Sequence, residues 1–251
     1  MAQGILKLLN GVVSTFIAII ICILAAYSIY ALWDNNQIYA AADDVQADLL
    51  QMKPIVEEDG GASFEELLKI NKDVCAWVTL DGTKIDYPVL QGENILSYIN
   101  TDVYGNFALA GSIFLDNDND PGFHDSYSLI YGHHMADHKM FGDLDLYEEE
   151  KFFNEDTTGS LILPDRSYKL EIFATLLISS SENAIFDPEQ WFTDIEGLMT
   201  FTETNALLMH QDTMEALRND ENPQIVAFST CSNDFTDART VVLARMIPVS
   251  R

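Results

Sequence analysis

The chain has 251 residues and a formal net charge of −27. Such an acidic protein repels polyanions, which argues against nucleic acid as a partner and gives little reason to expect docking on anionic lipid head groups. Apolar residues make up 48% of the chain, enough for a sizeable core. The length fits a single tethered domain.

Three cysteines, Cys22, Cys75 and Cys231, are too few for a disulfide framework. Cys22 lies in an apolar N-terminal segment. Cys75 lies in an alternating apolar run, which favours a small buried hydrophobe. A bridge between Cys75 and Cys231 stays open as an alternative.

The first candidate element is a membrane span. Leu8 to Trp33 is a run of 26 residues without a charge. About 20 apolar residues span the hydrocarbon core as a helix, whereas the apolar part of a cleavable signal peptide usually has about 7–15. We therefore predict a retained anchor, although Ala40-Ala41-Ala42 has the composition of a cleavage site.

The charges on either side of this span predict its orientation. Lys7 precedes the span, and Asp34 and Asp43 follow it. The positive-inside rule then places the N-terminus in the cytoplasm and the rest of the chain outside the cell. The predicted location is the cell membrane, with a single pass.

Two helices are expected after the anchor. Apolar residues at helical spacing predict one helix over residues 34–53, capped by Asp34. Residues 54–61 break this pattern. Ser63 and Glu66 then form a capping-box pattern that predicts a second, short helix.

From Val74 onward the apolar period changes to two, which predicts strands. The candidate strands are 74–80, 85–89, 111–115, 127–131, 159–163, 168–178, 224–230 and 239–246. Asp81-Gly82 is a hairpin-turn signal, and residues 189–219 return to helical spacing. A mainly β fold follows, as a mostly antiparallel barrel or sandwich, because closing about eight strands removes exposed edges.

The strongest chemical signal lies within residues 224–246, where two apolar strands flank a loop of seven residues. Cys231 ends the first strand and Arg239 begins the second. If the two strands pair antiparallel, both residues lie at one rim of the sheet. A neighbouring guanidinium favours the thiolate and can donate hydrogen bonds to a developing oxyanion.

His133 is the candidate proton partner because it follows a strand and a glycine, another strand-end position. A nucleophilic cysteine needs a group that can also protonate the leaving amine, and histidine titrates in the right range. Taken singly, these residues also fit a structural cysteine, an ordinary histidine and a salt-bridging arginine. The case therefore depends on their joint context.

That context resembles a known family. Ser229-Thr230-Cys231, with Arg239 eight positions on, is similar to the signature of the sortases. Further segments resemble class B members of that family, and the likeness covers roughly residues 64–246. These segments are Tyr131–Met135 with Met140-Phe141-Gly142, Val74–Gln91 and Gly111–Asp116.

The resemblance implies a fold and a division of the chain. The fold is an eight-stranded sortase-type β-barrel with N-terminal helices and a helical insert before the Cys-bearing strand. Residues 1–33 would be the cytoplasmic stub and transmembrane signal anchor, 34–62 the N-terminal helix and linker, and 63–251 the sortase catalytic domain.

The resemblance also implies a cysteine transpeptidase, a peptidase of the cysteine class. Cys231 would attack the carbonyl of a C-terminal sorting signal in a secreted protein. His133 would protonate the leaving amine, and Arg239 would stabilise the oxyanion. An amine from a peptidoglycan precursor, or a pilin lysine, would resolve the thioacyl-enzyme. Ser229 and Thr230 are carried over as supporting groups.

Several points stay open at this level. His134 is the fallback for His133. No Asp or Asn can be assigned to orient the histidine, although Asn233, Asp234 and Asp237 are near Cys231 in sequence. Wall anchoring is preferred over pilin polymerisation. A tethered cysteine peptidase that only hydrolyses, and an inactive binding module, are the other candidates.

No cofactor and no metal are predicted. Asp116, Asp118 and Asp120 resemble the start of a calcium loop, but Pro121 and Tyr127 stand where such a loop needs Gly and Glu. A turn-forming acidic loop is the preferred interpretation. The histidines at 133, 134 and 138 lack the glutamate of a zinc HExxH motif.

Overall fold

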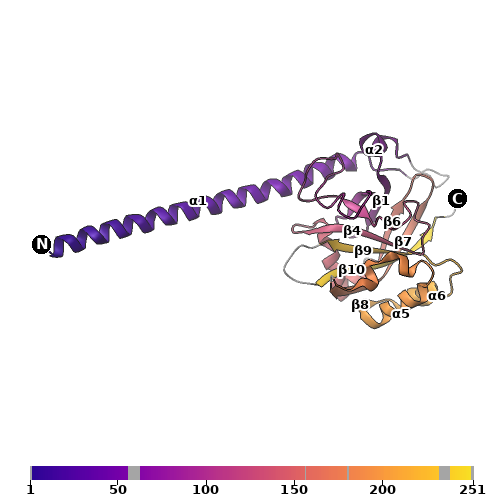
Figure 1. Cartoon of the computed structure of the whole chain (residues 1–251). Coiled ribbons are helices and arrows are strands. Elements are labelled where there is room, and N and C mark those ends of the chain that lie inside the picture. Colours follow the sequence, from indigo (N-terminus) through magenta and orange to yellow (C-terminus); the bar gives the residue numbers. More distant parts are fainter. Residues whose placement is uncertain (1, 56–62, 156, 180, 232–237, 250–251) are drawn as a thin grey trace. The chain divides into compact units, whose positions relative to one another are not determined.

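The computed structural model of the protein describes residues 2–55, 63–155, 157–179, 181–231 and 238–249. Contacts within the chain divide it into two units, Met1–Asp43 and Asp44–Arg251. The first unit consists of a single helix. The second holds the sheet and the other helices (Figure 1).

The N-terminal helix α1 (Ala2–Leu50) is continuous, so the expected separate helix beginning at Asp34 is wrong. No glycine or proline lies between Asp34 and Leu50 to break the hydrogen-bond ladder, and Pro54 comes only after the end of α1. The apolar part of α1 reaches a mean hydropathy of 2.6, and by length and composition the helix can cross a membrane.

The short helix α2 (Glu65–Ile70) forms where it was expected, but its cap differs. Its N-cap residue is Phe64, whose side chain makes no capping hydrogen bond, so the predicted capping box at Ser63 is wrong. Glu65 and Glu66 in the first turn still complement the positive end of the helix dipole. Leu67 is buried and holds α2 on the core.

Eight strands form a closed barrel, which confirms the predicted fold class. Their spatial order is β10-β9-β4-β3-β2-β1-β6-β7, and pairing of β10 with β7 closes the ring. The eight strands are β1 (Val74–Leu80), β2 (Asp86–Leu90), β3 (Ile113–Leu115), β4 (Tyr127–Met135), β6 (Thr158–Ile162), β7 (Ser167–Ser179), β9 (Ile225–Cys231) and β10 (Ala238–Pro248). Two further strands lie outside the ring: β5 (Lys139–Met140) pairs with β4, and β8 (Ala206–Met209) pairs with β7.

Among the residues that the structure describes, the strand pairs are mostly antiparallel, as expected, and two pairs are parallel. β2 pairs parallel with β3, and β4 pairs parallel with β9. The second parallel pair matters for the site, because β4 and β9 then end at the same edge of the barrel. In Figure 1, β9 lies between β4 and β10.

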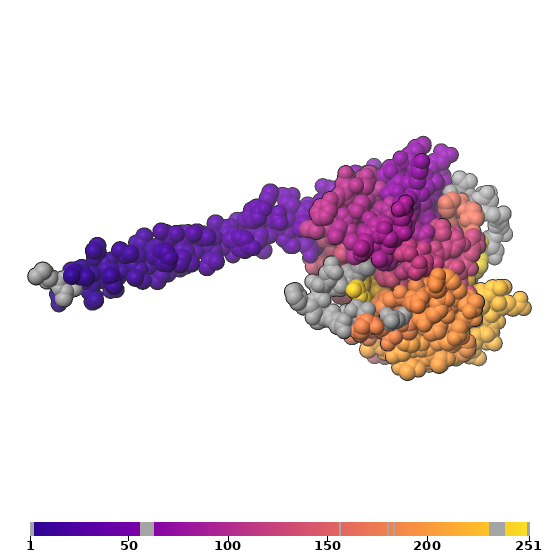
Figure 2. All heavy atoms as spheres, viewed as in Figure 1, coloured from indigo at the N-terminus to yellow at the C-terminus, as the bar shows by residue number. Residues whose placement is uncertain are grey.

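The helical insert before β9 is present but is more divided than predicted. It contains α4 (Asn183–Phe186), the 3₁₀ helix η2 (Pro188–Trp191), α5 (Ile195–Asn205) and α6 (Gln211–Arg218). Within the stretch 189–219, expected to be helical, the residues of β8 add a strand to β7 instead. Space-filling atoms show the insert, in orange, as one continuous mass (Figure 2).

A second helical segment follows the β4–β5 hairpin. It consists of the 3₁₀ helix η1 (Gly142–Glu148) and α3 (Glu150–Glu155). Leu144 and Tyr147 of η1 are fully buried, so η1 is fixed to the barrel rather than solvated. This anchoring places η1 beside the strand that carries His133.

Phe228 offers a test of the core beneath the candidate site. Its side chain is fully buried on β9 and meets Phe141 edge-on, with ring centroids 6.1 Å apart. We expect Phe228→Ala to lower the free energy of unfolding by about 3–5 kcal/mol through lost burial and a cavity. Urea unfolding of the full-length chain, followed by tryptophan fluorescence, measures this.

The matched control is Phe107→Ala, because Phe107 is 77% exposed. Its effect should stay within about 0.5 kcal/mol. Equal effects of the two substitutions would contradict the assigned packing of Phe228.

Candidate functional site

The register of β4 and β9 aligns two of the candidate residues. In the parallel ladder, His133 is the direct partner of Cys231. The neighbouring ladder pairs Val241 of β10 with Ser229 of β9, and Arg239 lies two residues before Val241 on β10, toward the end of β9 that carries Cys231. Because β9 lies between β4 and β10, His133 and Arg239 belong to the two strands that flank the strand of Cys231.

Arg239 is half-buried at the start of β10, and two contacts orient its guanidinium. Nη1 donates a hydrogen bond to the carbonyl oxygen of Thr230, at 2.8 Å. The guanidinium carbon lies 6.0 Å from the ring centre of Phe186, at the end of α4, within cation–π range. These contacts hold the positive charge next to the end of β9.

The ring of His133 contacts a backbone group that no sequence motif could reveal. Its Nε2 lies 2.6 Å from the carbonyl oxygen of Ile99, in the long connection between β2 and β3. From the sequence, no Asp or Asn could be assigned to orient this ring. Asn233, Asp234 and Asp237 lie outside the described residues.

The hairpin that follows His133 is held in a constrained conformation. Asp137, His138 and Met140 all have positive φ angles, of 59°, 64° and 50°. Non-glycine residues adopt this region at a cost and keep it where their surroundings determine it.

Contacts on both sides determine the hairpin. Phe141 N–H donates to the His133 carbonyl at 2.9 Å, and Met140 N–H donates to the Tyr87 hydroxyl at 3.0 Å. Asp143, 2% exposed, accepts from Lys84 N–H and pairs with His138 Nδ1. The end of β4 is therefore fixed by the residues around it.

The remaining sequence candidates occupy different places. His134, the fallback, pairs through Nε2 with Asp145 at 2.6 Å. Ser229 is fully buried beside Tyr131 in the β4–β9 register, and Thr230 supplies the carbonyl that Arg239 contacts. The backbone of Cys231 lies in β9.

A buried carboxyl group, that of Asp116 directly after β3, contacts Tyr131, which lies two positions before His133 on β4. Tyr131 donates its hydroxyl hydrogen to Asp116 Oδ2 at 3.0 Å, and Asp116 is 5% exposed. Burial raises the pKa of Asp116 above its ordinary value, and hydrogen bonds from Asp118 N–H and Tyr131 oppose this only in part. The sequence showed Asp116 as part of an acidic run and gave no sign of this contact.

Cys75 lies outside the candidate site, and its thiol is poorly suited to act as a nucleophile. Cys75 has a free thiol, which excludes the bridge to Cys231 that the sequence left open. Its Sγ donates to the Val89 carbonyl at 3.4 Å, and burial raises its pKa to about 12. A thiol with so high a pKa is a poor nucleophile at neutral pH.

The acidic loop after β3 binds its own backbone. Asp116 Oδ1 accepts from Asp118 N–H at 3.0 Å, and Asp120 Oδ1 accepts from Gly122 N–H at 3.1 Å. These contacts are those of a turn-forming loop, which was the preferred interpretation. Within the described ranges, no group of three or more His, Cys, Asp or Glu residues is arranged to hold a metal ion.

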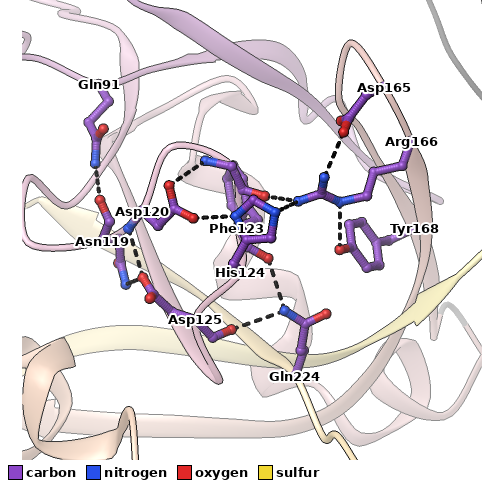
Figure 3. A network of polar contacts seen from close by, with 11 residues as sticks. Gln91, Asn119, Asp120, Phe123, His124, Asp125, Asp165, Arg166, Tyr168 and Gln224 are labelled. Atoms are coloured by element: carbon purple, nitrogen blue, oxygen red, sulfur yellow. Dashed lines mark hydrogen bonds and ion pairs between the residues drawn. The ribbon is translucent and has the colours of Figure 1, made fainter.

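A polar network occupies the opposite end of β4 (Figure 3). Arg166 contacts His124, the Gly122 carbonyl and the Tyr168 hydroxyl, while Gln224 donates to the carbonyls of Phe123 and Asp125. A hollow of about 380 Å³ opens beside it. Ser126, in its wall, precedes His133 by seven residues, or about 23 Å of extended strand, so this hollow is separate from the candidate site.

The chain is similar to known proteins in sequence and in fold. Residues 78–247 match the sortase domain family. Sortase B of Staphylococcus aureus is 27% identical over 235 residues, which cover 92% of this chain and 94% of that protein. A crystal structure of a Streptococcus pyogenes class B sortase involved in pilus biogenesis is 36% identical, with a TM-score of 0.66, and the match covers 73% of this chain and 97% of that one.

Sortase B of Listeria monocytogenes is also similar, with 28% identity over 220 residues. That match covers 86% of this chain and 87% of the relative. These relatives therefore align over nearly their whole length rather than over a shared fragment.

Asp116 provides a pH-dependent prediction. Its pKa is raised by folding, so the folded state holds more protons than the unfolded state, and stability falls as pH rises through the unfolded and then the folded pKa. Asp116→Asn removes the titrating carboxyl group, so the variant does not lose stability in this way. The amide oxygen of the new side chain can still accept a hydrogen bond from Tyr131. We expect the free energy of unfolding of the variant, relative to wild type, to rise as pH increases from 3 to 7.

Urea titrations at several pH values measure this difference. Glu93→Gln is the control, because Glu93 is an exposed carboxylate in the connection between β2 and β3. A difference between Asp116→Asn and wild type that stays constant with pH would contradict a raised pKa at Asp116.

Proposed function

This chain belongs to the sortase family of cysteine transpeptidases and to its class B, and we propose that it cleaves a C-terminal sorting signal of secreted proteins and joins the product to a cell-wall amine. The observation that carries the proposal is that His133 pairs with Cys231 across the β4–β9 ladder, while Arg239 contacts the Thr230 carbonyl from the other side of β9. The proposed nucleophile, the proton carrier and the permanent cation then belong to three neighbouring strands at one edge of the barrel.

The roles of the three residues follow from their chemistry. The Cys231 thiolate attacks the carbonyl carbon of the sorting signal, and Arg239 donates hydrogen bonds to the oxyanion that forms. His133 gives its proton to the amine as the carbon–nitrogen bond breaks, which leaves a thioacyl-enzyme. The acceptor amine then loses a proton to His133 and attacks the thioester, which frees Cys231.

The contacts of Arg239 support this assignment. Nη1 is engaged by the Thr230 carbonyl, next to the proposed nucleophile, and Phe186 lies beside the guanidinium. The planar, always charged guanidinium can therefore present donors from a fixed position. Ser229 and Thr230 act as supporting groups, because they build the buried strand end that carries Cys231.

The proposed cellular setting follows from α1. A helix of this length and hydropathy would anchor the enzyme in the cell membrane, with Lys7 on the cytoplasmic side and the barrel outside. Secreted proteins that carry a sorting signal would meet the enzyme there as they leave the cell. A peptidoglycan precursor would supply the amine at the same surface.

Pilin polymerisation is the second candidate. The observation in its favour is the 36% identical Streptococcus pyogenes relative, which is described as involved in pilus biogenesis. The two candidates differ in the acceptor, a peptidoglycan amine or a pilin lysine. Competition between these two amines for one thioacyl-enzyme, followed by mass spectrometry, separates them.

Substitution of the three residues tests the proposal. We expect Cys231→Ala to abolish ligation of a sorting-signal peptide to an added amine, and His133→Ala to slow it by about 10²–10⁴-fold. Arg239→Lys should lower kcat/KM by about 10²–10³-fold, because lysine keeps the charge but not the planar fork. Ligation is measured with and without the amine by mass spectrometry.

Cys75→Ala and Arg218→Lys are the matched controls, since Cys75 faces the Val89 carbonyl and Arg218 pairs with Glu196 and Glu203 on the surface. Both should keep ligation near the wild-type rate. Peptide release without any ligated product would show a hydrolytic peptidase instead. If Arg239→Lys turns over at the wild-type rate, the proposed role of the planar guanidinium of Arg239 is refuted.

A further inference from the structure

The contact between His133 and Ile99 determines which ring nitrogen carries hydrogen. A carbonyl oxygen has no hydrogen to donate, so the bond at 2.6 Å requires a hydrogen on Nε2 of His133. This holds whether the imidazole is neutral or charged. In the neutral ring, Nδ1 is then the nitrogen without a hydrogen.

The residue before Ile99 fixes that carbonyl in place. Tyr98 is 6% exposed, and its hydroxyl donates to Asp73 Oδ2 at 2.6 Å. Asn71 Nδ2 donates to the same hydroxyl at 3.0 Å, and Ser112 N–H donates to the Tyr98 backbone carbonyl at 3.0 Å. Because Ile99 is the next residue in the chain, these contacts of Tyr98 also fix the position of the Ile99 carbonyl.

Gly111 packs against the same two carbonyls. Its φ angle is +58°, a region that favours glycine. A Cβ atom at this position would lie 2.5 Å from the Ile99 oxygen and 2.7 Å from the Tyr98 oxygen. Both contacts are with backbone rather than with a flexible side chain, so any larger residue must displace the oxygen that His133 binds.

We propose that the Ile99 carbonyl, held in place by Gly111, is the positioning group for His133 and that Nδ1 is the nitrogen that exchanges protons with the Cys231 thiol. The inference rests on the proposed transpeptidase function. In the acylation step, Nδ1 takes the proton of the Cys231 thiol, and the resulting thiolate attacks the carbonyl carbon. It gives that proton to the amine as the carbon–nitrogen bond breaks.

The first test observes the ring directly and needs no variant. The chain contains five histidines, which makes selective labelling practical. Full-length protein labelled with ¹⁵N in its histidine rings, compared with His133→Gln, identifies the signals of His133. We expect the neutral ring to carry its hydrogen on Nε2, and a hydrogen on Nδ1 would overturn the proposal.

The second test uses two glycines of the same connection. Gly111→Ala should lower kcat for ligation by about 10²-fold, the scale of a 1 Å misplacement, with KM for the peptide within about 2-fold. Gly105→Ala is the matched control: its φ is +81°, but a Cβ there meets nothing within 4 Å. Gly105→Ala introduces the strain of a positive φ angle but no steric clash of the new Cβ atom, so its kcat should stay within about 3-fold of wild type.

The outcomes separate the inference from the function on which it rests. A Gly111→Ala protein that folds and turns over like Gly105→Ala would overturn the inference while leaving the transpeptidase intact. A wild-type ring with hydrogen on Nε2 in a protein without ligation activity would support the positioning and refute the function. If Gly111→Ala does not fold, Tyr98→Phe takes its place.

Tyr98→Phe keeps the buried ring and removes the hydroxyl bonds to Asp73 and Asn71. We expect a smaller fall in kcat, about 5–10-fold, with a broadened or shifted Nε2 signal of His133. An unchanged signal together with unchanged kcat would contradict the anchoring of the Ile99 carbonyl through Tyr98.

Discussion

The parallel ladder between β4 and β9 is the constraint on which the rest of the structure depends. Parallel neighbours cannot be joined by a tight turn, so the chain must leave the end of β4 and return to the start of β9 by a long route. Along that route lie β6, β7 and the helical insert. Closure of the ring by β7 and β10 completes the edge at which His133 and Cys231 stand in register.

Within the part of the chain that the structure describes, backbone carbonyls contact both basic side chains of the candidate site. Arg239 bonds to the Thr230 carbonyl, and His133 bonds to the Ile99 carbonyl. A carbonyl oxygen fixes the direction of the side chain and leaves its positive charge in place. A carboxylate would fix the direction as well, but it would also neutralise the charge. In a chain with a net charge of −27, this kind of partner leaves the positive charge of Arg239 available for the oxyanion of the proposed reaction.

Most of the barrel could be predicted because each strand carries its own alternation of apolar residues. The exceptions have physical causes. β8 has the short apolar sequence Ala206–Met209, which fits helix and strand equally, and the free edge of the 13-residue strand β7 decides the outcome. α1 passes through Asp34 because a capping residue does not end a helix unless the chain also turns there.

The site could be predicted only as far as side-chain chemistry is visible in a sequence. Cys231, His133 and Arg239 stand out by residue type and by their places at strand ends. The Ile99 carbonyl does not, because every residue has one and only the fold selects which carbonyl meets His133. The parallel register was equally hidden, since it arises from pairing between distant segments.

The environment of Cys75 has a practical consequence for labelling the enzyme. Burial keeps this sulfur protonated at neutral pH, and Cys22 lies within the apolar helix α1. A charged, membrane-impermeant electrophile at pH 7 would therefore discriminate against both thiols. Under the proposed function, the native chain would then accept a single covalent tag, at Cys231, without the removal of any other cysteine. Such a tag would count active molecules.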